Sequence, residues 1–272
     1  MLPALPTPTP LQIAVIVLAP VVPAVLYAFY VRNLEGHERE PWRAVSFAMV
    51  LGLAVGIAFL LPVALLLFEQ FARESDQVTS LRNFRGVLLL LVLLPLFEEA
   101  IKLACLTFLK KEINEVEDGL IYGVMVGAGF GIAEGWIGGL GLTDRSLYLF
   151  VSLVALRGLS GVFLHANSTA LAGYGLSRHW VEKKSRYIVP YFLFAVGLHA
   201  LSNVFAFVQI SVGGVDEGLL SLARLAFVLV LASLTFRYVR RRLHELIKEL
   251  DRATDPRLRA GGAQARQPRR EK

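Results

Sequence analysis

Long apolar segments constrain this chain more than any other feature of its sequence. About 20 apolar residues suffice to cross a bilayer as a helix, and a helix satisfies its backbone hydrogen bonds internally. The candidate segments are 11–31, 44–68, 86–109, 119–141, 147–176, 187–209 and 218–239. The sequence therefore predicts an all-α fold, a polytopic membrane helix bundle with about seven transmembrane helices.

Composition and patterning support one membrane domain with a basic tail. Hydrophobic residues make up 55% of the 272 residues and charged residues 18%, against about 25% in soluble domains. We predict a transmembrane domain over 1–240 and a basic tail over 241–272 that is disordered at its end. The fifth apolar segment is interrupted by Arg157 and Gly158, so the pattern does not place its ends. The single cysteine, Cys105, excludes an intramolecular disulfide.

Basic residues predict the orientation and the partners. No basic residue precedes Arg32, so the N-terminus lacks the charged start of a cleavable signal peptide. Lys and Arg favour cytoplasmic segments, and here they predict a multi-pass protein of the cell membrane with its N-terminus outside and its C-terminus cytoplasmic. The tail is suited to anionic lipid at the bilayer surface. It carries no aromatic residue after Tyr238 that could stack on bases, so no nucleic-acid partner is predicted.

Ionisable side chains interrupt the third to sixth apolar segments. Each costs roughly 2.5–3.5 kcal/mol at the centre of a membrane helix, and such residues usually mark a functional site. Four consecutive helices contribute to this set, which suggests one shared layer. Its members are Glu98, Glu99, Lys102, Glu134, Arg157, His165 and His199.

The spacing of these residues leaves several roles open. Glu98 and Glu99 both lie within one turn of Lys102, so they could form a self-neutralised cluster or provide a general base or a metal ligand. Asn203 follows His199 at i+4 and could either stabilise an oxyanion or orient the histidine. Arg157 is predicted to be a counter-ion to the acidic residues. The glycines four residues apart from 119 to 135 predict close helix packing.

Four motifs resemble the PrsW family of intramembrane proteases. They are EEAIK at 98–102, DGLIYGVMVGAGFGIAEG at 118–135, HANSTALAGYG at 165–175 and HALSN at 199–203. The resemblance covers about 90–210 and leaves the first two apolar segments and the tail outside it. Carried over residue by residue, it implies the site residues Glu98, Glu99, Lys102, Glu134, His165 and His199. Gly135 departs from the pattern, because the family often has Asn there.

The resemblance implies an intramembrane endopeptidase, distantly related to CAAX-processing and bacteriocin-processing membrane proteases. Its substrates would be membrane-anchored proteins such as anti-sigma factors, cleaved in the site-1 step of regulated proteolysis. From the residues themselves, no serine is placed in a triad, so water activated by a glutamate is the remaining nucleophile.

Two schemes for activating the water stay open. In one, Glu98 or Glu99 acts with His165, while His199 and Asn203 stabilise the oxyanion. In the other, His165, His199 and Glu134 hold a zinc ion that activates the water. A proton-coupled membrane transporter that uses the same buried charges is the alternative function, and a non-catalytic scaffold is a third reading.

Overall fold

The computed structural model describes residues 7–34, 39–73 and 88–211, together with separate residues between 226 and 248. These parts form helices and no strand, which confirms the predicted all-α class. The elements are α1 Pro10–Arg32, α2 Trp42–Arg73, η1 Leu89–Leu93, α4 Leu94–Thr107, α5 Val116–Leu140, α6 Leu147–Glu182, η2 Ser185–Tyr187 and α7 Ile188–Ser211.

Five helices in the described part are long and apolar enough to cross a membrane. They correspond to the first, second, fourth, fifth and sixth predicted segments, and span Pro10–Arg32, Trp42–Leu66, Val116–Leu140, Leu147–Glu182 and Ser185–Val204. The third predicted segment is not among them, because its described part consists of η1 and the 14-residue α4. The seventh segment and the tail lie largely outside the described residues.

The interruption of the fifth apolar segment does not break the helix, because α6 runs from Leu147 to Glu182 through Arg157 and Gly158. Gly158 is instead a contact point with α1. A Cβ on this residue would lie 2.9 Å from the carbonyl carbon of Ala19 and from the nitrogen of Pro20. The glycine therefore allows two helix backbones to approach within the bundle.

A single π-helical turn, η1, precedes the Glu-Glu-Lys segment. The Leu94 N–H bonds to the carbonyl of Leu89, five residues earlier, and Pro95 follows as one of the first residues of α4. Proline has no N–H to donate to the preceding turn. The π-helical turn therefore ends just before Pro95, which lies in the first turn of α4, where proline is tolerated. Glu98, Glu99 and Lys102 then follow within the regular part of α4.

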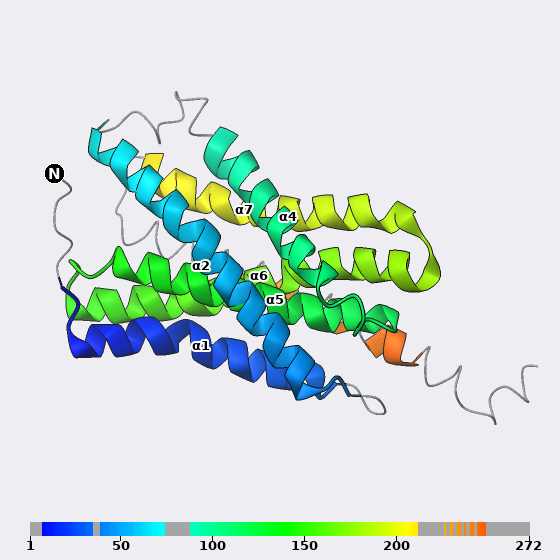
Figure 1. Ribbon diagram of the computed structural model, residues 1–272. Coiled ribbons are helices and arrows are strands. Elements are labelled where there is room, and N and C mark those ends of the chain that lie inside the picture. The colour runs from blue at the N-terminus through cyan, green and yellow to red at the C-terminus, as the bar shows by residue number, and fades with distance from the viewer. Residues whose placement is uncertain are drawn as a thin grey trace, which may run out of the picture.

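Helix α5 forms the centre of the bundle and is buried along most of its length. In Figure 1, α5 and α6 (green) run side by side, α1 (blue) lies along them, and α2 crosses over them. Glycines of the predicted ladder face the backbone of α6, because a Cβ added to any of the next three would collide with it. At Gly123 the added Cβ would lie 2.6 Å from the Cα of Ala170, and at Gly131 it would lie 2.8 Å from the Cα of Val162. At Gly127 it would overlap the carbonyl of His165.

The DGLIYG motif builds the start of α5, remote from the charged layer. The Asp118 carboxylate accepts hydrogen bonds from the backbone N–H groups of Asn114, at 2.7 Å, and Glu115, at 2.8 Å. The Tyr122 hydroxyl donates to the carboxylate of Glu40, which precedes α2. These contacts cap α5 and fix it against the beginning of α2.

The close contact of α5 and α6 predicts a large effect of one methyl group. Gly127→Ala is expected to lower the free energy of unfolding by about 1–3 kcal/mol, because the added Cβ collides with backbone that cannot move aside. Gly197→Ala on α7 is the matched control, since no described atom from another part of the chain lies within 4 Å of its added Cβ. Denaturant titration of both variants in detergent measures the difference. Equal stabilities would contradict the rigid contact.

Candidate active site

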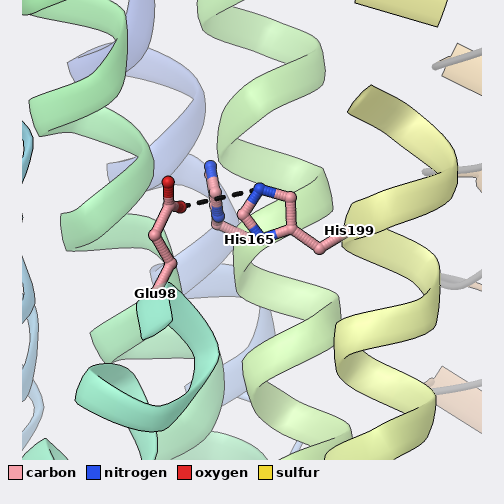
Figure 2. A group of neighbouring side chains, drawn as sticks. All are labelled: Glu98, His165 and His199. Atoms are coloured by element: carbon pink, nitrogen blue, oxygen red, sulfur yellow. Dashed lines mark ion pairs between the residues drawn. The ribbon is translucent and has the colours of Figure 1, made fainter. Parts of the chain in front are cut away.

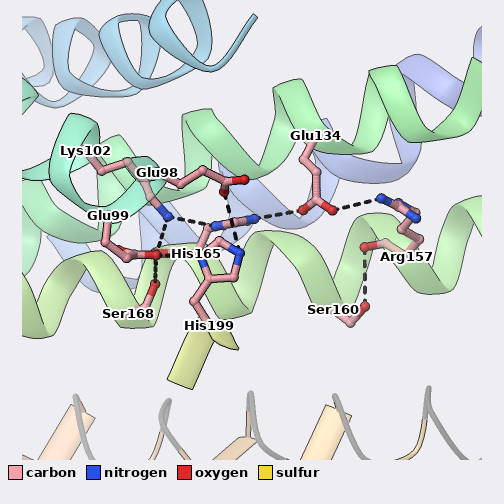
Figure 3. Close-up of polar contacts among 9 residues, drawn as sticks. All are labelled: Glu98, Glu99, Lys102, Glu134, Arg157, Ser160, His165, Ser168 and His199. Atoms are coloured by element: carbon pink, nitrogen blue, oxygen red, sulfur yellow. Dashed lines mark hydrogen bonds and ion pairs between the residues drawn. The ribbon is translucent and has the colours of Figure 1, made fainter. Parts of the chain in front are cut away.

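Four helices bring the predicted ionisable residues into one connected group. Helix α4 carries Glu98, Glu99 and Lys102, α5 carries Glu134, α6 carries Arg157 and His165, and α7 carries His199 (Figure 3). Most of these side chains are buried, and those of Glu99 and Lys102 are 0% exposed. The predicted shared layer is therefore present.

Glu99 is the centre of the hydrogen bonds on the α4 side. Its Oε1 accepts from Lys102 Nζ at 2.5 Å, from His199 Nδ1 at 2.9 Å and from Ser168 Oγ at 3.2 Å. Its Oε2 is buried, and no described residue donates a hydrogen bond to it. Glu99 therefore holds side chains from three helices with one oxygen.

The self-neutralised cluster forms only in part. Lys102 pairs with Glu99 at i,i+3, whereas Glu98 approaches a different helix, with its Oε2 3.5 Å from Nε2 of His199. Glu98 is thus placed beside an imidazole, in a position where it could bind a ligand.

His165 connects the two ends of the group. Lys102 Nζ lies 2.9 Å from Nδ1 of His165, and Glu134 Oε2 lies 2.8 Å from Nε2 of the same ring. A lysine ammonium can only donate, so Nδ1 accepts and Nε2 carries the hydrogen directed at Glu134. The Phe130 ring lies against both basic groups, 4.8 Å from the Lys102 ammonium and 5.4 Å from the imidazole centroid.

Glu134 and Arg157 form the more accessible end of the group. Arg157 Nη2 donates to Glu134 Oε1 at 2.9 Å, and the two side chains are 37% and 32% exposed. The predicted role of Arg157 as a counter-ion thus agrees with its contact. Figure 3 shows the whole series of contacts, from Lys102 through His165 and Glu134 to Arg157, along α5 and α6.

Three of these residues could hold a metal ion. Glu98, His165 and His199 are buried, and one ligand atom from each lies within 4.8 Å of the others. The two imidazole rings meet edge to face, with centroids 4.9 Å apart, and the carboxylate approaches them from α4 (Figure 2). This cluster contains Glu98 where the sequence suggested Glu134, which instead contacts His165.

One contact of the site was not predicted. Ser168 donates to Glu99 and lies one turn after His165. The i+3 spacing of His165 and Ser168 in the sequence HANS could have indicated that Ser168 faces the site. Asn203 is half-buried one turn after His199, and its role stays a prediction.

A helical membrane bundle with two histidines and three glutamates in one largely buried group defines a candidate intramembrane hydrolase. The family model for the PrsW family intramembrane metalloproteases matches residues 40–234, and the chain belongs to this family. No curated protein and no solved structure gives a significant match. The match begins at residue 40, so the second apolar segment belongs to the family region. This corrects the extent of about 90–210 that was expected from the motifs alone.

Family membership assigns the chain to the peptidases. It therefore favours the predicted protease over the transporter and the scaffold. The family is one of metalloproteases, which is consistent with a metal ion in the Glu98, His165 and His199 cluster.

Proposed function

We propose that this chain is a metal-dependent intramembrane endopeptidase that hydrolyses membrane-anchored proteins. The observation that carries the proposal is the convergence of Glu98, His165 and His199 from three helices within 4.8 Å in a buried site. Two histidines and one glutamate form a known catalytic zinc set, which leaves one coordination position for water. We therefore propose a zinc ion at these three residues.

The chemistry of the donors fits this assignment. His199 Nδ1 lies 2.9 Å from Glu99 Oε1, and donating its hydrogen there leaves the Nε2 lone pair directed toward Glu98. A carboxylate that orients a ligating histidine in this way is common around metal ions. For His165 to bind a metal ion through Nε2 as a neutral imidazole, the Nε2 hydrogen must be released and Nδ1 must carry the ring hydrogen, which Lys102 can supply by giving one of its protons to Nδ1.

A zinc ion bound there would make a water molecule acidic enough to be deprotonated near neutral pH. We propose Glu134 as the group that takes the proton from the attacking water and delivers it to the leaving amine. Its Oε2 lies 2.8 Å from Nε2 of His165, and thus beside the proposed ligands. Glu99 and Lys102 then hold the two imidazoles in place, because each contacts the Nδ1 atom of one ring.

The metal-free scheme remains the alternative within the same protease. Glu99 Oε1 already accepts three hydrogen bonds, so Glu98 would be its general base. His165 would assist, and His199 with Asn203 would stabilise the oxyanion.

Metal removal separates the two schemes. Treating the purified full-length protein with a chelator is expected to abolish cleavage of a single-span reporter protein, and added Zn²⁺ is expected to restore it. Elemental analysis of the active protein should give close to one zinc per chain. Full activity in protein without stoichiometric metal would contradict the zinc site and leave the metal-free scheme.

We propose that the substrate is a single-span membrane protein of the anti-sigma-factor type, on the basis of the family resemblance. Membranes from cells with the intact chain can be compared with membranes from cells with Glu98→Gln. A single-span protein that accumulates uncleaved only with the variant would be the substrate. Unchanged fragment patterns would contradict this substrate class.

We also propose that the protein lies in the cell membrane with its N-terminus outside and its C-terminus cytoplasmic. The C-terminal ends of α1, α4 and α6 lie toward one side of the bundle (Figure 1). Arg32, Lys110 and Lys184 lie at or just after these ends, so the basic residues gather where the positive-inside rule places the cytoplasm.

A further inference from the structure

Arg157 lies on the face of α6 that also carries His165. Arg157, Gly161 and His165 follow one another at i+4 spacing, so they share one face of the helix. The Glu134 carboxylate lies across this face, and a Cβ at Gly161 would stand 3.4 Å from its Oε2. Figure 3 shows the carboxylate between the guanidinium and the imidazole.

A glycine on α5 makes room for the guanidinium. A Cβ at Gly138 would lie 2.5 Å from Nε and 2.7 Å from Cζ of Arg157. Gly138 follows Glu134 by one turn, so the guanidinium can rest on α5 while its Nη2 reaches the carboxylate. The position of the arginine is therefore defined by backbone as well as by charge.

The two oxygens of Glu134 have different partners. Arg157 Nη2 lies 2.9 Å from Oε1, and His165 Nε2 lies 2.8 Å from Oε2. The terminal torsion of a glutamate has broad, shallow minima, so a carboxylate held at one oxygen alone can rotate. Donors at both oxygens restrict that rotation, and Arg157 is the donor that remains when a metal ion takes the place of the hydrogen on His165 Nε2.

We infer that Arg157 is a positioning residue of the protease, which holds Glu134 so that Oε2 stays at the proposed ligands. This inference rests on the proposed function, because it acts through Glu134 as the proton acceptor. Charge balance alone would require no particular orientation of the carboxylate. The bridged geometry gives Arg157 a role in the rate of the reaction rather than in substrate binding.

Kinetics of the full-length zinc-loaded protein with a single-span reporter test this role. Arg157→Gln is expected to lower kcat about 10–100-fold, the range seen when partners of metal-site residues are removed, with KM and zinc content unchanged. Arg157→Lys should recover part of the loss, because an ammonium can still donate to Oε1. Arg145→Gln, an exposed arginine paired with Asp144, is the matched control and should match the unmodified protein.

A double-variant cycle tests whether the effect passes through Glu134. If it does, Arg157→Gln in the Glu134→Gln background lowers kcat no further than Glu134→Gln alone. Fully additive losses, an unchanged kcat in Arg157→Gln, or a full-rate Glu134→Gln would each overturn the inference.

Infrared spectroscopy gives a readout that does not depend on cleavage. The carboxylate band that disappears in Glu134→Gln belongs to Glu134, and its frequency depends on the donors at each oxygen. It should shift in Arg157→Gln and stay in place in Arg145→Gln, and a band that stays in place in Arg157→Gln would overturn the inference. If the unmodified protein failed to cleave any single-span reporter, the proposed function would fall, while the infrared result would still decide whether Arg157 holds Glu134.

Discussion

Glu98→Gln is expected to abolish reporter cleavage and to remove zinc from the purified protein. The amide keeps the size of the side chain and loses the negative charge that would bind the metal ion beside His165 and His199. Because Glu98 is not the partner of Lys102, the change leaves no unpaired ammonium, and the fold should persist. Reporter kinetics, elemental analysis and circular dichroism on the same preparation measure the three outcomes.

The control for this variant is Glu112→Gln. Glu112 is exposed in the connection between α4 and α5, so the same chemical change there should leave activity and zinc content as they are. Glu98→Gln protein that kept both zinc and full activity would contradict the ligand role. Loss of activity with zinc retained would also contradict the ligand role and would instead support Glu98 as a general base.

Glu99→Ala is expected to cause the largest loss of stability. Lys102 would keep its charge in a fully buried position without its carboxylate partner, and removing one member of a buried ion pair costs about 3–5 kcal/mol. His199 and Ser168 would lose their acceptor as well. The free energy of unfolding in mixed detergent measures the loss.

A second substitution distinguishes the ion pair from the site. The double variant Glu99→Met with Lys102→Met removes both charges and is expected to recover most of the stability, since apolar residues of similar volume often replace buried pairs without loss. It should remain inactive, because neither imidazole keeps its partner at Nδ1. Recovery of cleavage in the double variant would show that Glu99 and Lys102 serve stability alone.

The sequence predicted the shared layer because a membrane helix makes each charge conspicuous. Glu98, Glu134, His165 and His199 stand out from apolar surroundings, and their depth along each helix follows from counting residues. The glycine ladder likewise predicted the close contact of α5 and α6, because a repeat of four places small residues on one face.

The sequence did not predict which side chains of the layer form pairs. Helical spacing allowed Lys102 to bind either Glu98 or Glu99, and only the rotation of α4 against α6 and α7 selects Glu99. The choice between Glu98 and Glu134 beside the histidines depends on the same packing. The ends of the fifth segment could not be placed because the partners of Arg157 and Gly158, which are Glu134 and Pro20, lie far away in the sequence.

The glycine contacts divide the site into a fixed part and an adjustable part. Glu134 and His165 belong to helices whose backbones touch, so their separation cannot change without separating α5 from α6. Glu98 comes from α4, which has no glycine, and His199 comes from α7, whose close contact with Gly175 of α6 is made by Tyr191, about two turns before the histidine. A metal ion would thus join Glu98 and His199 to His165 of this fixed pair, and the affinity of the site would depend on how far α4 and α7 stand from α6.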